Sequence, residues 1–106
     1  MGRIVIACYK PRPGQEAALS ALVAEHVPSL RALGLATHRA PVLMQAGDGT
    51  VVEVFEWSSA DAIQTAHAHP VVLQMWDRFN AVCEFLPLAS VSEASSLFPE
   101  FTPMAS

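Results

Sequence analysis

The stretch from residue 58 to residue 88 constrains the fold of this chain more than any other. After a break at His69-Pro70, its apolar residues recur at spacings of three and four, which places them on one face of a helix. These residues are Val72, Met75, Trp76, Phe79, Val82, Cys83 and Leu86. We therefore expect a short helix followed by a longer amphipathic helix. Its wide apolar face needs a large flat surface to pack against, and only a β-sheet in this chain offers one.

Four segments are expected to form that sheet. They are residues 3–10, 35–45, 51–57 and 88–93. The first and third segments carry apolar side chains on both faces, whereas a strand with one face in water alternates apolar with polar residues. Pro41 cannot donate to a strand ladder, so it indicates an edge position or a bulge in the second segment. Two glycines within residues 46–50 predict a hairpin turn between the second and third strands.

The first helix is expected over residues 15–33, where His26 lies among the leucines and valines of the apolar stripe. Pro28 falls on the opposite, solvent-facing side, where it bends the helix. The order β-α-β-β-α-β predicts an α+β, ferredoxin-like fold, which is an antiparallel sheet with two helices on one face. We expect a single domain over residues 1–106, with its core at 3–93. The tail, residues 94–106, is expected to lie along a surface, such as that of a partner.

Two helices cover only one face of such a sheet, yet the strands are apolar on both. The composition agrees with a further covered surface, because 52% of the residues are hydrophobic and only 15% are charged. A face of this kind has several hundred Å² of apolar surface, and at roughly 25 cal/mol per Å² its burial contributes on the order of 10 kcal/mol before association costs. We therefore predict a homodimer, in which two sheets close into a dimeric α+β barrel.

The sequence argues against several classes of partner. A net charge of −4 and the lack of a basic run argue against nucleic acid. No apolar run reaches the roughly 18 residues that a membrane span needs, so no membrane is expected as a partner. The N-terminus does not read as a signal peptide, which predicts a cytoplasmic protein. In that compartment Cys8 and Cys83, both among apolar residues, are expected to be reduced and buried.

Three histidines are candidates for chemistry in a pocket between the helices and the sheet. His26 lies near the centre of the first helical stripe, His67 follows Ile63 by four residues, and His69 precedes the Pro70 break. No HxxxH or HExxH pattern is present, so neither a metal nor another cofactor is expected. One of these histidines could act as a base that deprotonates a phenol or an enol. The alternative is structural, with His26 bonded to the backbone and the other two at helix ends.

Other side chains were considered for the same pocket. Trp76 and Phe79 are either pocket walls or part of the core, and Tyr9, the only tyrosine, either makes a hydrogen bond or points into the barrel. Glu53 and Glu56 fall on opposite faces of their strand, so one of them must be covered. A buried carboxylate needs a partner, and Arg39 on the neighbouring strand is the natural one, either as a structural ion pair or beside a catalytic Glu53.

Three short motifs resemble one known family. They are KPRPGQE at residues 10–16, VFEWSS at 54–59, and HAHP at 67–70 followed by Met75-Trp76. Over about residues 3–93 the chain resembles the dimeric α+β barrel superfamily, and within it the antibiotic biosynthesis monooxygenase (ABM)-like domains. Members of that family include cofactor-free monooxygenases of polycyclic aromatics, haem-degrading enzymes and isomerases. The haem-degrading members use an Asn, a Trp and a His, but here the first strand holds no Asn and no His follows Trp76.

The resemblance implies two alternative functions. The first is a cofactor-independent monooxygenase or related isomerase that acts on an aromatic or enolisable substrate. In that case His26, His67 or His69 would be the base, and Trp76 with Phe79 would line the pocket. The second is a non-catalytic dimeric barrel that binds a small hydrophobic ligand or serves a structural role. A shared void reached by His26 and His67 would favour the enzyme, and a filled interior would favour the scaffold.

Overall fold

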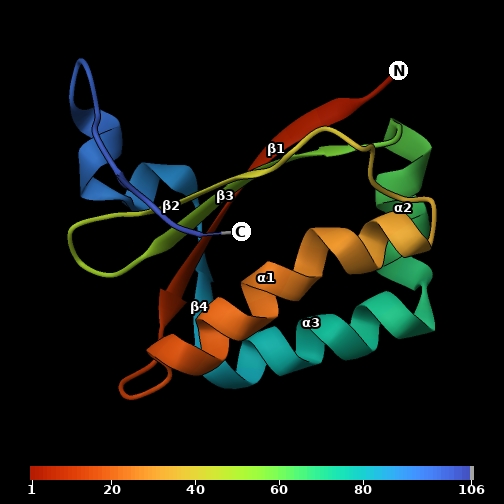
Figure 1. The fold of residues 1–106 in the computed structure, drawn as a ribbon, viewed down its shortest axis with the longest axis horizontal. Helices are drawn as coiled ribbons and strands as arrows, with labels where there is room; N and C mark the ends of the chain where they lie inside the picture. The colour runs from red at the N-terminus through yellow and green to blue at the C-terminus, as the bar shows by residue number, and fades with distance from the viewer. Residues whose placement is uncertain (106) are drawn as a thin grey trace.

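The computed structural model describes residues 1–105, which form an antiparallel sheet with helices packed on one of its faces (Figure 1). The strands are β1 (Arg3–Pro11), β2 (Val42–Gln45), β3 (Val51–Trp57), β4 (Cys83–Leu86) and β5 (Thr102–Pro103), in the spatial order β4-β1-β3-β2-β5. The helices are α1 (Glu16–Ala32), α2 (Ala60–Ala68) and α3 (Pro70–Val82). Figure 1 shows α1 and α3 side by side across the sheet. The predicted α+β, ferredoxin-like arrangement is confirmed.

The helix boundaries follow from local capping chemistry. Gly34 takes a positive φ of 74°, a conformation that favours glycine, just beyond the end of α1. The Ser59 hydroxyl accepts the backbone N–H of Ala62 at 3.0 Å and so begins α2. His69 ends α2 and begins α3, and its Nδ1 accepts the backbone N–H of Val71 at 3.2 Å. The predicted break is therefore a shared cap, with Pro70 as the first residue of α3.

The strand register decides which side chains face the helices. In the antiparallel pairing of β1 with β3, Val5 lies opposite Phe55 and Ala7 lies opposite Glu53. Tyr9 is two residues further along β1 and points to the same side, because strand side chains alternate between faces. This face of the sheet and the inner faces of α1 and α3 enclose the main core, which includes Leu19, Val23, Leu30, Val72 and Phe79. The fully buried Glu53 is placed inside this core.

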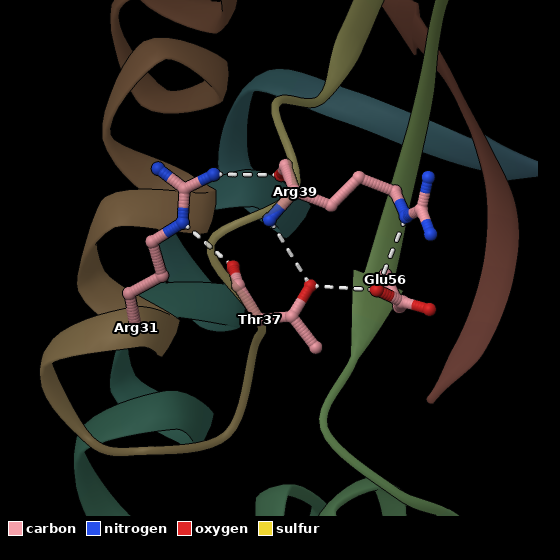
Figure 2. A network of polar contacts seen from close by, with 4 residues as sticks. All are labelled: Arg31, Thr37, Arg39 and Glu56. Carbon is pink, nitrogen blue, oxygen red and sulfur yellow. Dashed lines mark hydrogen bonds and ion pairs between the residues drawn. The ribbon is translucent and has the colours of Figure 1, made fainter. Parts of the chain in front are cut away.

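The second strand is shorter than expected. Only Val42–Gln45 pairs as a strand, and Ala36 forms a single bridge with Trp57. Between them the chain turns around Glu56, whose Oε1 accepts the Thr37 hydroxyl at 2.8 Å and Arg39 Nε at 3.1 Å (Figure 2). From α1, Arg31 donates Nε to the carbonyl of Thr37 at 2.8 Å and Nη2 to that of Arg39 at 2.7 Å. These bonds satisfy the backbone of a segment that has left the sheet.

The fourth strand lies earlier in the chain than predicted. It is Cys83–Leu86, directly after α3, whereas residues 88–93 fall in two short 3₁₀ turns, Leu88–Ser90 and Ser92–Ser95. The error has a physical cause, because a spacing of three from Cys83 to Leu86 fits a helical stripe as well as a strand end. In the structure β4 pairs with β1, so that Leu86 lies opposite Cys8.

The face of the sheet away from the helices is covered in part by the chain's own C-terminal segment, residues 87–105. Val91 is buried there with Cys8, Ala46 and Val52, and β5 pairs with β2 and forms the edge of the sheet. The remainder of this outer face carries Ile4, Ile6 and Val42, which are 58%, 47% and 54% exposed. The tail therefore lies along the chain's own sheet. The homodimer stays a prediction.

Over the part of the chain that the structure describes, no helix is both long and apolar enough to cross a membrane.

Candidate functional site

A cavity of about 490 Å³ lies between the helices and the inner face of the sheet. Its walls are mainly apolar and include Val5, Ala7, Phe55, Trp57, Ile63 and Phe85. The lining residues that carry polar atoms are Tyr9, His26, His67, Trp76 and Asn80. This volume is in the range of about 300–1,000 Å³ that is usual for small-molecule sites, and apolar walls with a few polar groups are typical of them.

His26 is the polar centre of the cavity. It comes from the middle of α1 and is only 3% exposed. The indole Nε1 of Trp76 lies 3.2 Å from His26 Nε2, and an indole nitrogen can only donate. His26 Nε2 is therefore an acceptor, and the ring proton is on Nδ1. That Nδ1–H donates to Glu53 Oε1 at 2.8 Å. The contacts thus fix both the tautomer and the orientation of the ring.

Glu53 lies behind the cavity wall and is completely buried. Its Oε1 accepts two hydrogen bonds, from His26 Nδ1 at 2.8 Å and from the Tyr9 hydroxyl at 2.7 Å. Within residues 1–105, its Oε2 is buried without a hydrogen-bond partner. Burial, and then the negative charge of Glu53 and the hydrogen bond to it, raise the pKa of Tyr9 well above 10. Tyr9 therefore stays a neutral donor to the carboxylate.

Aromatic rings pack against the hydrogen-bonded Tyr9 and His26 and hold them in place. Phe79 is fully buried, with its ring centroid 5.0 Å from that of Tyr9 and 5.2 Å from that of His26. Phe55 meets His26 edge to face at 5.4 Å. His26 is thus confined by packing as well as by hydrogen bonds. Phe79, expected as a pocket wall, instead lies behind the wall and supports the two residues that do line it.

The other predicted site residues are separated by the structure. His67 reaches the cavity wall, with its Nδ1 2.7 Å from the carbonyl oxygen of Ile63 and its ring 5.1 Å from that of Trp76. His69 is the cap between α2 and α3 and lies outside the cavity walls. The Arg39 side chain is 62% exposed and pairs with Glu56, which corrects the expected pair with Glu53. Arg39 was expected on a strand beside Glu53, but it lies in the segment that has left the sheet and reaches Glu56 instead.

The sequence contains a signal for the His26–Glu53 pair. Each is a lone polar residue at a position that its apolar neighbours mark as buried, so each needed a buried partner. Asn80 could also have been found, because it follows Trp76 by four residues and so shares its side of α3. Phe85 could not, because its place on the wall depends on where β4 begins.

Metal binding and thiol chemistry find little support in the described residues. Among residues 1–105, no group of three or more His, Cys, Asp or Glu side chains is arranged to hold a metal ion. Cys8 and Cys83 are free and buried, and burial raises the pKa of both thiols. Protonated thiols are poor nucleophiles.

Comparison with known proteins identifies the fold alone. No family model matches the chain, and no curated protein matches its sequence. Among solved structures, the chain is similar to Rv0793 from Mycobacterium tuberculosis, with a TM-score of 0.62 and 23% sequence identity. The match covers 82% of this chain and 94% of that one.

Proposed function

We propose that this chain binds a small aromatic or enolisable molecule in the cavity and that His26 acts there as a general base. The observation that supports it most strongly is the buried hydrogen bond from His26 Nδ1 to Glu53 Oε1, at 2.8 Å, in the wall of an apolar cavity. A carboxylate on one ring nitrogen orients the imidazole and stabilises the cation that forms when the other nitrogen takes up a proton.

The proposed step is the removal of a proton from a phenolic or enolic hydroxyl. The O–H bond breaks, its electron pair stays on oxygen, and the proton binds His26 Nε2. The resulting imidazolium lies against the Glu53 carboxylate, so the charge that the step creates in the protein is compensated at once. The electron-rich anion remains in an apolar cavity, where the surrounding rings suit a flat substrate.

The reaction that we propose to follow is a cofactor-independent monooxygenation, with dioxygen as the co-reactant. For the quinol 1,4-dihydroxynaphthalene the balance closes without any other reductant. One atom of dioxygen enters the ring to give 2-hydroxy-1,4-naphthoquinone, and the other leaves as water. The quinol loses four electrons and dioxygen gains four. The resemblance to ABM-like domains and the apolar walls support this reaction type.

One observation favours the alternative of a non-catalytic binding protein. In the structure the Nε2 atom of His26, which a base must keep available, accepts the indole N–H of Trp76 at 3.2 Å. A histidine held in this way on both nitrogens is typical of a structural residue. The two functions therefore differ in whether a ligand can displace this contact.

An activity assay separates these two functions. The purified protein is incubated with 1,4-dihydroxynaphthalene under ¹⁸O₂, and the product is analysed by mass spectrometry against a protein-free control. We expect a protein-dependent rate with one ¹⁸O atom in the product, and a loss of about 10²-fold or more in His26→Gln. His38→Gln, at an exposed position outside the cavity, is the matched control and should keep the full rate. An unchanged rate in His26→Gln would contradict the proposal.

We also propose that the protein is a homodimer that pairs through the open part of the outer sheet face. Ile4 and Ile6 on β1 and Val42 on β2, the two strands that flank β3, are each about half exposed there. Large apolar side chains that are exposed together on one face are typical of a surface covered by a partner.

A further inference from the structure

The contact between Trp76 and His26 points to the chemical group that the cavity recognises. Trp76 Nε1 donates to His26 Nε2 at 3.2 Å, and both residues line the cavity. When a ligand separates the two rings, the indole of Trp76 offers an N–H donor and Nε2 of His26 offers a lone pair. A ligand that enters between them must satisfy both, because a buried polar atom without a partner costs about 1–3 kcal/mol.

We propose that these two side chains form a clamp for a single hydroxyl group, and that Trp76 is a catalytic residue that holds the oxygen as its charge develops. This inference rests on the proposed role of His26 as a base and extends it. A hydroxyl oxygen accepts the Trp76 N–H, while its hydrogen is donated to His26 Nε2. A carbonyl or an ether can satisfy only Trp76. The substrate is therefore a neutral hydroxyarene or enol with an apolar body.

The geometry shows which of the two side chains, Trp76 or His26, has to move. Two hydrogen bonds of about 2.8 Å to one oxygen with a near-tetrahedral angle place Nε1 and Nε2 about 4.6 Å apart. The present separation is 3.2 Å, so the two edges must part by about 1.4 Å. His26 is fixed by Glu53 and by its ring contacts with Phe55 and Phe79. Trp76 is only partly buried and packs on the exposed His67, so the indole is the part that shifts.

The clamp also accounts for the stability of the anion. After proton transfer, the substrate oxygen carries the electron pair of the broken O–H bond. It then accepts two donors, the Trp76 N–H and the new N–H at His26 Nε2. The Trp76 N–H is already bonded to the oxygen in the bound complex, and the second donor is the proton that His26 Nε2 has just taken up. A donor that is in place where the charge develops lowers the barrier.

The test compares ligands that differ only in the hydroxyl group. The affinities of 2-naphthol and naphthalene are measured by NMR titration of the wild-type protein and of Trp76→Phe. We expect Trp76→Phe to weaken 2-naphthol about tenfold, which corresponds to one hydrogen bond, and to change naphthalene by less than about twofold. The matched control is Trp57→Phe, at the other tryptophan of the cavity, which should weaken both ligands by the same factor.

A second readout uses the wild-type protein and does not depend on any variant. The indole N–H resonance of Trp76 should shift when 2-naphthol is added and stay near its free position with naphthalene, whereas that of Trp57 should not distinguish the two. An equal loss for both ligands in Trp76→Phe, or an equal response of the Trp76 resonance, would overturn the clamp. Failure of the base would look different, because the ligand selectivity would remain while His26→Gln kept the oxygenation rate.

Discussion

Tyr9 offers a direct test of the buried polar group, because it is the only tyrosine in the chain. Its hydroxyl donates to Glu53 Oε1 at 2.7 Å, and burial together with that carboxylate raises its pKa well above 10. Below pH 10 the hydroxyl is protonated in both the folded and the unfolded chain, so its contribution to stability is complete. Above pH 10 the unfolded chain releases the proton and the folded chain keeps it. Stability is therefore lost as pH rises, by about 1.4 kcal/mol per pH unit.

The perturbation that isolates this effect is Tyr9→Phe. It keeps the ring between Phe79 and Phe85 and removes one hydrogen bond to a carboxylate, which should lower the free energy of unfolding by about 2 kcal/mol at pH 7–9. Above pH 10 the difference in free energy of unfolding between the two proteins should decrease by about 1.4 kcal/mol per pH unit. Only the wild type has a tyrosine that ionises in the unfolded chain and stays protonated in the folded one. Urea unfolding at pH 7, 9, 10 and 11 measures this difference. The two proteins share every other ionisable group, so the contributions of those groups cancel in the difference.

Two results would refute this reasoning. The first is a gap between wild type and Tyr9→Phe that stays constant from pH 7 to pH 11. The second is an absorbance titration near 295 nm in which Tyr9 of the folded protein ionises at about pH 10, as a free tyrosine does. Either would mean that the hydroxyl is not held against a buried carboxylate.

Three further predictions concern the site, the dimer and the fold. Glu53→Gln should lower kcat for quinol oxygenation by about 10²-fold with little change in KM, because a neutral amide cannot stabilise the His26 cation; an unchanged kcat would remove Glu53 from the mechanism. Ile6→Lys should convert a dimer into a monomer in light scattering at micromolar concentration, whereas Val71→Lys, equally exposed but on α3, should not; a wild-type monomer would contradict the dimer. Gly34→Ala should lower the free energy of unfolding in urea by about 1 kcal/mol, since its φ is 74°, and no loss would argue against that backbone.

The order of elements was predictable because each depends on a local pattern. The spacing from Val72 to Phe79 placed α3, and the short run of apolar residues within positions 3–10 placed β1. The errors arose where a local pattern has two solutions. Cys83 and Leu86 fit the helical stripe, and only their pairing with β1 shows that the helix has already ended. The strand expected at residues 35–45 is shortened to Val42–Gln45 because Thr37 and Arg39 bond to a side chain, Glu56, from another strand.

The sequence allowed us to predict which residues lie at the candidate site, but not which of them form hydrogen bonds with one another. His26, His67, Trp76 and Tyr9 were expected near one pocket, and the structure brings them to one cavity. Which of them bond to Glu53 depends on a register that pairs β1 with β3 and on the rotation of α1 above them. Neither quantity is encoded in residues that are close in sequence. His69 is of a residue type that is common in functional sites, but it lies at the junction of α2 and α3 and caps the helix there.

The C-terminal segment has a consequence for the behaviour of the protein in a crowded solution. β5 is paired with the edge of β2, and the Met104 N–H donates to the carbonyl of Leu43 at 2.9 Å, so part of that edge is already occupied. The same segment covers Cys8 and Val52. A free strand edge beside an apolar surface is a template for aggregation. We therefore expect proteolytic removal of the chain beyond Ser90 to expose this edge and this apolar surface together and to promote aggregation.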